Sequence, residues 1–213
     1  MEREYISVTD TAKLIRIVLK ESFPGVKFSV KSSKYSGGAS INIHYTDGPA
    51  PDLVDHAVDC FSGSYFDGMI DYQGSVYATL DDKPVRFGAD FIFSNQKHSE
   101  TNILYGVWAF IDDWAKTGKS LINTPVADWG PATLCDYFKR GLLMNEYLTG
   151  VPSRDVHRLI HECIREVSAV PCCDSKTRDR VQVTHSDGYG STSLPNEDGQ
   201  TATGYPELNR GTP

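Results

Sequence analysis

Hydrophobic and polar residues alternate along residues 26–46, and this alternation predicts two neighbouring β-strands. Val26, Phe28 and Val30 share one side of the first strand. After a break at residues 36–38 the alternation resumes, and the apolar set of the second strand is Ala39, Ile41, Ile43 and Tyr45. A period of two with one apolar face is typical of a half-buried antiparallel pair. Because residues 37–38 are Gly-Gly, which suits the turn of a hairpin, we expect a hairpin with one face on the core and one in water.

A second apolar run, Val85 to Phe93, is expected to form one further strand beside this hairpin. Its odd-numbered residues are all apolar, so Val85, Phe87, Ala89, Phe91 and Phe93 are expected to share the buried face. Shorter strands are expected at residues 76–80 and 181–184. Apolar residues at helical spacing predict helices over residues 8–23, 52–61, 100–116, 134–148 and 153–169. In the helix over residues 100–116, the predicted apolar stripe is Leu104, Val107, Trp108, Ile111 and Ala115.

The order of these elements predicts an α+β fold, a small antiparallel sheet with helices packed on one face. A helical extension and a polar tail are expected to follow this sheet. We therefore divide the chain into an α+β domain over residues 1–118, a helical extension over 119–171 and a tail over 172–213. The tail is rich in Ser, Thr, Asp and Gly, a composition that indicates a flexible segment.

Composition narrows the class of protein without showing a reaction. The net charge of −7 argues against a protein that coats nucleic acid along its whole surface, although residues 1–49 carry an excess of basic residues. The five cysteines are irregularly spaced, which indicates reduced thiols rather than a disulfide framework. Since no apolar run approaches the roughly 20 residues of a membrane helix and no signal peptide is recognisable, we expect a cytoplasmic protein that does not bind a membrane.

A zinc site is one candidate for chemistry. His157 and His161 lie four residues apart on a predicted helix, so they share a face, and Cys172 and Cys173 follow shortly after the helix. Imidazole and thiolate groups are the ligands that zinc prefers. The spacing matches no recognised zinc pattern, however, and we favour surface histidines and free thiols, with no cofactor.

Two further constellations can be assembled from the sequence. Asp67, Asp71 and Asp90, together with Asp47, can be imagined as metal-binding carboxylates, but Asp beside Gly is usually a turn residue. Tyr65, Asp67 and Asp71 lie in an aromatic loop that is either a packed connector or a binding edge. A Cys60, His56 and Asp59 triad is disfavoured because Cys60 is expected to point into the core. No convincing catalytic constellation remains.

The polar side of the predicted sheet is the remaining candidate surface. Its basic and polar residues can contact phosphate groups of a nucleic acid. The candidates are Lys27, Lys31, Lys34, Asn42, His44 and Arg86. The simpler interpretation is a solvated sheet face, and the pattern places no stacking aromatic residue there.

Several blocks of the N-terminal half resemble a known family. They are residues 5–16 (YISVTDTAKLIR), 23–30 (FPGVKFSV), 35–41 (YSGGASI), 46–49 (TDGP), 66–71 (FDGMID) and 86–93 (RFGADFIF). In this order they resemble the large polyvalent protein-associated domain of the twenty-ninth type, over about residues 5–115. The family occurs in proteins carried by phages and conjugative elements.

This resemblance implies an accessory protein that enters a host with invading DNA and blunts its defences, CRISPR systems among them. It implies no catalytic residue. Our leading hypothesis is therefore a binding protein that inhibits a host defence protein or complex by direct contact. The alternatives are a nucleic-acid-binding module that uses the polar sheet face, and a metal-dependent enzyme.

Overall fold

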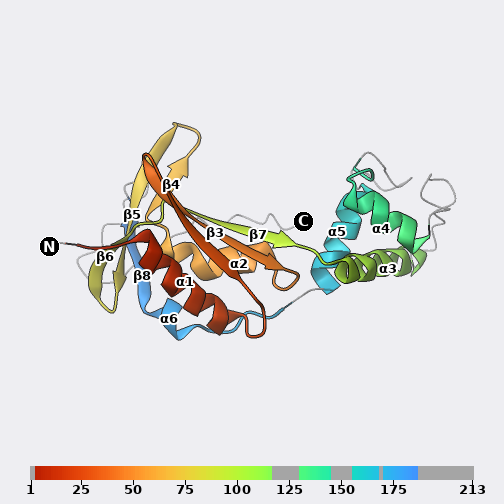
Figure 1. Cartoon of the computed structure of the whole chain (residues 1–213), viewed down its shortest axis with the longest axis horizontal. Coiled ribbons are helices and arrows are strands. Elements are labelled where there is room, and N and C mark those ends of the chain that lie inside the picture. The colour runs from red at the N-terminus through yellow and green to blue at the C-terminus, as the bar shows by residue number, and fades with distance from the viewer. Residues whose placement is uncertain (1–2, 117–129, 145–154, 168–169, 187–213) are drawn as a thin grey trace, which may run out of the picture.

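Two lobes with separate apolar cores make up the computed structural model, which describes residues 3–116, 130–144, 155–167 and 170–186 (Figure 1). The fold is α+β, as predicted. The sheet lobe comprises residues 3–98 and 170–186, and the helical lobe comprises the described residues between them. The strands are β1 (Glu4–Ile6), β2 (Ser29–Tyr35), β3 (Gly38–Thr46), β4 (Ser64–Asp67), β5 (Tyr72–Leu80), β6 (Lys83–Phe87), β7 (Phe91–Lys97) and β8 (Val181–Ser186). The helices are α1 (Val8–Ser22), α2 (Pro51–Val58), η1 (Asp59–Phe61), α3 (Glu100–Lys116), α4 (Pro131–Lys139), α5 (Val156–Val167) and α6 (Lys176–Asp179).

The predicted hairpin of residues 26–46 is present and forms most of a three-stranded sheet. β2 and β3 pair antiparallel through a turn in which Gly37 adopts a positive φ of 99°, a conformation that glycine adopts without strain. β7 then pairs with β3 in parallel, so the strand order is β2-β3-β7. The inner face of this sheet packs on α1 and α2, and Ile41 and Ile43 are fully buried there. Phe28 packs on the same core, with its ring centroid 5.1 Å from that of Tyr45.

A second sheet occupies the other side of the sheet lobe, so the lobe contains two sheets where the sequence predicts one. Its strands follow the order β1-β6-β5-β4, and β8 also pairs with β5. The pairs are antiparallel except for β1 and β6, which run in parallel. The predicted strand at 76–80 is the C-terminal half of β5.

The prediction of one strand over Val85 to Phe93 is wrong. The run is divided into β6 and β7, which belong to different sheets. Between them, Gly88 N–H donates to Ile6 O (2.8 Å) and Asp90 N–H donates to Ala39 O (2.8 Å), so the backbone crosses from one sheet to the other. Because of this crossing, the odd-numbered apolar residues are buried in β6 but lie on the outer side of the sheet in β7. Val85 and Phe87 are buried, whereas Phe93 is 49% exposed.

The helical lobe is built on close contact between α3 and α5. A Cβ at Gly106 would lie 2.2 Å from Ile164 Cγ1, so only glycine allows this approach. The buried stripe of α3 consists of Ile103, Gly106, Val107 and Phe110. The predicted stripe is therefore centred on the wrong side of the helix, because Leu104 and Trp108 are exposed.

The two predicted C-terminal helices are shorter in the described residues. α4 ends at Lys139 rather than near residue 148, and Gly141 then turns the chain with a φ of 68°. Residues 145–148 lie outside the described residues. The helix expected over 153–169 is α5, and its predicted ends also lie outside them.

The chain after Cys172 returns to the sheet lobe instead of leaving the fold as a tail. Glu21 of α1 accepts hydrogen bonds from Ser175 Oγ (2.6 Å) and from the Thr177 backbone N–H (3.0 Å), which fixes the start of α6. These donors lower the pKa of the Glu21 carboxyl, with the Ser175 hydrogen bond as the main cause. β8 then pairs with β5, and Val181 is buried in the core. The rest of the expected tail, residues 187–213, lies outside the described residues.

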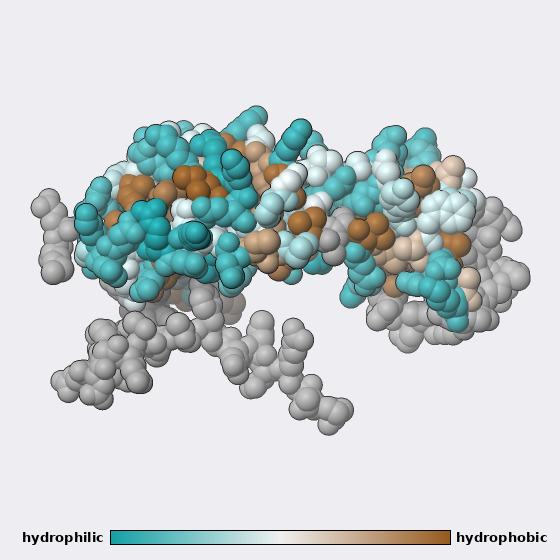
Figure 2. Space-filling model, turned by 90° about the horizontal axis from the view of Figure 1, so that it is seen from below, coloured by the Kyte–Doolittle hydropathy of each residue, from teal (hydrophilic) through white to brown (hydrophobic). Residues whose placement is uncertain are grey.

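Side-chain contacts between described residues join the two lobes at the end of the three-stranded sheet. Arg165 Nη2 of α5 lies 2.9 Å from Asp52 Oδ1 of α2, and the rings of His98 and His161 meet edge to face with centroids 5.4 Å apart. The surface viewed from below shows hydrophobic residues in small groups among hydrophilic ones (Figure 2). None of the described helices has both the length and the apolar character needed to cross a membrane.

Candidate functional site

In the part of the chain that the structure describes, no helix covers the outer face of the three-stranded sheet, because α1 and α2 both pack on the inner face (Figure 1). Residues that pair directly across strands project to the same side. The register places Lys31, Asn42 and Phe93 in one row, and Ser29, His44 and Asn95 in the next. Ser40 pairs with Phe91, and Thr46 pairs with Lys97, which extends the face in both directions. We call these residues, with Ser33, Tyr35 and Gly38, the outer sheet face.

Two phenylalanines lie side by side on the outer sheet face. The rings of Phe91 and Phe93 are stacked, with centroids 6.1 Å apart and an interplanar angle of 18°. Phe93 is 49% exposed, and Tyr35 at the opposite corner of the face is also 49% exposed. Large apolar side chains at these positions leave much of their area in water, so burial in the fold does not explain them.

The charge of the outer sheet face is opposite to that of the whole chain. Its cations are Lys31 and Lys97, with His44 between them, and none of its strand positions is Asp or Glu. The Asp90 carboxylate lies at the edge of the face, because a Cβ at Gly38 would lie 2.6 Å from Asp90 Oδ2. Within the described ranges, neither Lys31 nor Lys97 forms an ion pair. The nearby carboxylate of Asp90 accepts a hydrogen bond from the Ala39 backbone N–H at 2.7 Å. The face therefore offers positive charge to an anionic ligand.

The structure brings together half of the basic and polar residues expected on this surface. Lys31, Asn42 and His44 share the outer sheet face. Lys27 precedes β2. Lys34 pairs with Ala39 and so occupies an inner-face position of β2. Both side chains are exposed. Arg86 lies on β6 in the other sheet, paired with Tyr5, so its placement on this face is wrong.

The expectation that this face lacks stacking aromatic residues is also wrong. The sequence analysis treated residues 85–93 as one strand, so it placed Phe91 and Phe93 on the same buried side as Val85 and Phe87. The crossing at residues 88–90 interrupts this alternation. The signal that was available is Gly88 beside Asp90, a pair of residue types that commonly interrupts a strand.

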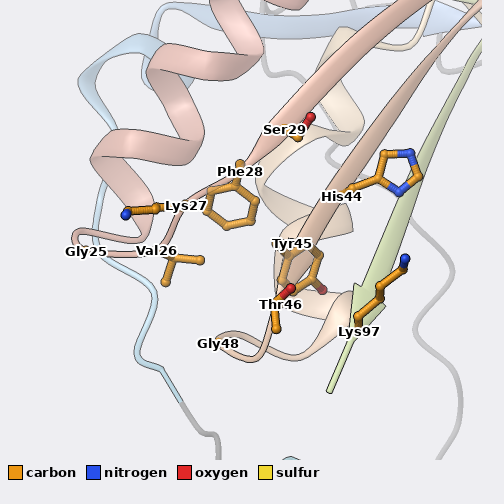
Figure 3. A pocket seen from close by; sticks show the side chains of 10 residues that line it. All are labelled: Gly25, Val26, Lys27, Phe28, Ser29, His44, Tyr45, Thr46, Gly48 and Lys97. Atoms are coloured by element: carbon orange, nitrogen blue, oxygen red, sulfur yellow. The ribbon is translucent and has the colours of Figure 1, made fainter. Parts of the chain in front are cut away.

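A hollow of about 720 Å³ lies at one end of the sheet, where β3 and β7 end (Figure 3). Phe28, Tyr45 and Val26 line its inner side, and Ser29, His44 and Lys97 line its outer side. His44 and Lys97 project to one side of the strands, and Phe28 and Tyr45 project to the other (Figure 3). Burial raises the pKa of the Tyr45 hydroxyl to about 12, so this group stays neutral beside the hollow.

The tip of the β4–β5 hairpin is a second exposed surface of a different kind. Met69 is 92% exposed, Ile70 is 55% exposed and Phe66 is 54% exposed. Asp67 Oδ1 accepts a hydrogen bond from the Met69 backbone N–H at 2.9 Å, and Asp71 adopts a positive φ of 51°, so the turn has a defined shape. We call residues 66–72 the hairpin tip.

The base of this hairpin is tightly packed. The rings of Tyr65 and Tyr72 meet edge to face at 6.5 Å, and a Cβ at Gly74 would lie 2.3 Å from the Tyr65 ring. Tyr65, Asp67 and Asp71, the loop residues singled out from the sequence, therefore shape the hairpin. Met69 and Ile70, which the sequence did not single out, are its most exposed apolar groups, followed by Phe66.

The four residues proposed for zinc do not meet. The ring of His157 stacks on Phe138 at 4.5 Å, whereas His161 faces His98. The backbone N–H of Cys173 donates to Ser22 O at 2.8 Å, which places the two cysteines at the end of α1 in the other lobe. No group of three or more His, Cys, Asp or Glu side chains arranged for a metal ion occurs among the described residues.

The carboxylates proposed for metal chemistry serve the backbone at separate places. Asp47 Oδ1 accepts from the Ser99 N–H (2.8 Å) at the joint between the lobes. Asp90 binds the Ala39 N–H, and Asp67 binds the Met69 N–H. These are turn and crossing positions, as the structural interpretation predicts, and they do not converge.

Cys60 is buried in the core of the sheet lobe, as expected. Burial raises the pKa of its thiol to about 12, so the nucleophilic thiolate is scarce at neutral pH. His56 lies beside Asp59 (3.7 Å) rather than activating the thiol. This geometry gives no support to a Cys–His nucleophile.

These two surfaces belong to a part of the chain that matches a known family model. Residues 6–99 match large polyvalent protein associated domain 29. The resemblance inferred from the sequence is thereby confirmed over this range, although it does not extend to residue 115. The polyvalent protein associated domain ends where α3 begins, so it includes the outer sheet face and the hairpin tip and leaves out the helical lobe. Such domains are typical of phages and other mobile elements. No curated protein and no solved structure was found to match the chain.

Proposed function

We propose that this protein is an accessory protein of a mobile element that binds a host defence protein, a CRISPR component being one example, through its hairpin tip. The family match supports the mobile-element setting. The observation that carries the proposal is the exposure of Met69, Ile70 and Phe66 at the end of a hairpin whose base is packed. Exposed apolar side chains grouped on one projection are typical of a protein contact.

The charges at the hairpin tip favour a protein over other partners. Asp67 and Asp71 flank the apolar side chains, and residues 62–82 contain no Lys or Arg. Carboxylates at this position repel nucleic acid phosphates and anionic lipid headgroups. A partner with an apolar pocket rimmed by Lys or Arg fits both the apolar and the charged groups of the tip.

Affinity capture from the lysate of a host that carries defence systems tests this function. The full chain is compared with the Met69→Ser/Ile70→Ser variant, and the captured proteins are identified by mass spectrometry. The matched control is Ile17→Ser/Met144→Ser, since these side chains are also exposed, by 46% and 57% respectively.

We expect the full chain and the control to capture a defence protein in similar amounts. The amount captured by the tip variant is expected to be lower by roughly tenfold or more. The same tip variant is expected to lose protection of an infecting phage in a plaque assay. Capture of no defence protein by the folded chain, or equal capture by the tip variant, contradicts the proposal.

A further inference from the structure

We infer that the outer sheet face binds single-stranded nucleic acid, with bases stacked on Phe93 and Phe91 and phosphates held by Lys31 and Lys97. This site lies on a different surface from the hairpin tip and stands independently of the proposed protein contact. Three observations carry it. They are the aromatic pair, the two lysines of the face, and the hydrogen bond that the neighbouring Asp90 carboxylate accepts from the Ala39 backbone N–H.

The aromatic pair supplies a stacking platform. Phe93 is 49% exposed at the edge strand, and its ring is stacked with that of Phe91 at 6.1 Å. The flat face of a base can stack on such a ring whatever its sequence, because every base has a π-face. Tyr35, 49% exposed on β2, adds a third ring at the opposite edge.

Cations and polar groups surround the rings at distances that suit a nucleic acid backbone. Lys31 lies in the same row as Phe93, two strand spacings or about 10 Å away. Lys97 lies six residues beyond Phe91 on β7, which corresponds to about 20 Å. The side chains between these two lysines are Asn42, His44, Asn95 and Ser29, which can donate hydrogen bonds to phosphates or base edges.

The dimensions and the charge select the class of ligand. A face of about 10 by 20 Å accommodates two or three nucleotides, as on other sheet platforms that bind unpaired bases. A duplex keeps its bases inside the stack and cannot place them on the rings. Two lysines without a described ion pair, on a chain whose net charge is −7, favour an anionic ligand for this face.

Fluorescence anisotropy with labelled oligonucleotides of about twelve nucleotides tests the inference. Oligo(dT), oligo(rU) and a DNA duplex of equal length are titrated with the full chain at low salt. The two single-stranded probes tell DNA from RNA, and the duplex tests whether unpaired bases are required. We expect binding of at least one single strand, and binding of the duplex weakened roughly tenfold or more.

Variants of the face test which residues hold the ligand. Phe93→Ala and Phe93→Leu both remove the ring, and leucine keeps an apolar side chain at the site, so a loss shared by both reports stacking. We expect each to weaken binding roughly tenfold. The matched control is Tyr105→Ala, which removes a 58% exposed ring from the helical lobe and is expected to leave affinity unchanged. Circular dichroism confirms that each variant is folded.

Salt dependence tests the role of the lysines separately. Each phosphate contact contributes about 0.7 to the slope of log affinity against log salt for a single strand, so Lys31→Gln/Lys97→Gln is expected to reduce the slope by about 1.4. Lys20→Gln/Lys83→Gln removes two exposed lysines elsewhere on the sheet lobe and serves as the control. The inference is overturned if the folded chain binds neither single strand at low salt, if the duplex binds as tightly, or if the Phe93 variants bind like the wild type.

Discussion

The two faces of the β2–β3–β7 sheet are made by alternate residues of the same strands. The inner face is largely buried, whereas much of the outer face is exposed. On the inner face, Ile41 and Ile43 are fully buried against α1 and α2. On the outer face, Asn42 and His44 alternate with them, and Phe91 and Phe93 lie beside them on β7. Folding explains the inner face because burial stabilises the native state.

Folding does not explain Phe93 of the outer face, which keeps about half of its surface in water, whereas its neighbour Phe91 is half-buried. The same contrast separates the packed base of the β4–β5 hairpin from its exposed tip. The residues that make up the two surfaces then differ in the sign of their charge, because the outer sheet face carries Lys31 and Lys97 and the hairpin tip carries Asp67 and Asp71. Two exposed surfaces of opposite charge on one domain are expected to bind different partners.

The largest difference between the faces is expected in stability. Ile41→Ala removes a fully buried side chain from the inner face and is expected to lower the free energy of unfolding by about 3 kcal/mol. Asn42→Ala, one residue further along the same strand, is the control and is expected to change it by less than about 0.5 kcal/mol. Equal losses for the two variants would mean that the outer face is also part of the core.

Chemical unfolding followed by far-UV circular dichroism, together with hydrogen exchange of the β3 amides, measures these changes. Both tryptophans in the described residues, Trp108 and Trp114, lie on α3. Intrinsic fluorescence therefore reports mainly on the helical lobe and is a poor probe for this comparison.

A smaller loss of stability is expected where the two sheets meet. Asp90→Ala removes the acceptor of the buried Ala39 backbone N–H and is expected to cost about 1–3 kcal/mol. Asp90→Asn keeps an oxygen acceptor at the same place, so its loss is expected to be smaller. The same unfolding experiment measures both variants, and an equal loss in the two would assign the effect to the negative charge instead of the hydrogen bond.

The joint between the lobes is expected to respond to pH. Burial lowers the pKa of His98, with His161 as a further cause and Asp47 acting in the opposite sense. Burial also lowers the pKa of His161, assisted by His157 and Arg165, while Glu162 opposes the shift. Both histidines are therefore harder to protonate in the folded protein than in the unfolded chain.

Below about pH 6.5 the unfolded chain takes up protons that the folded protein does not, so this stability is present above that pH and is lost as the pH falls. We expect the wild type to lose more stability between about pH 7.5 and about pH 5.5 than His98→Gln/His161→Gln. Unfolding followed by tryptophan fluorescence measures this loss of stability, because Trp108 and Trp114 lie on α3. Identical pH dependence in the two proteins would contradict the role assigned to this pair.

The smallest stability effect is expected for Phe93 itself. Phe93→Ala should lower the free energy of unfolding by no more than about 1 kcal/mol, because the side chain is half exposed and loses only its contact with Phe91 and its strand propensity. Thermal and chemical unfolding measure it directly. A loss of several kcal/mol would turn Phe93 into a structural residue and remove the contrast between the faces.

Much of the sheet lobe could be predicted from local patterns. The alternation in residues 39–45 and the Gly37 turn determine the β2–β3 hairpin, and helical spacing determines α1. These signals are local because each face of a strand or helix is decided by neighbouring residues. The α+β class followed from the order of the elements.

The candidate site could be predicted only in part, because its residues depend on contacts distant in sequence. Lys31, Asn42 and His44 were placed correctly by alternation on the hairpin. Phe93 was placed on the wrong face because the crossing at Gly88 is held by hydrogen bonds to Ile6 and Ala39, which no local pattern reveals. The strand expected at residues 181–184 is present within β8. Its pairing with β5 and the contact of residues 175–177 with α1 were missed for the same reason, since Glu21 is far from Ser175 in the chain.

Chemical-shift mapping tests the central claim, that the outer sheet face is a binding surface, most directly. A ¹H–¹⁵N spectrum of the full chain is recorded during titration with the single strand that binds. We predict shifts of the amides of Lys31, Asn42 and Phe93 and of their neighbours on β2, β3 and β7, with the hairpin tip and the helical lobe unchanged. Shifts confined to the tip or to the helical lobe, with β3 and β7 unaffected, would contradict the claim.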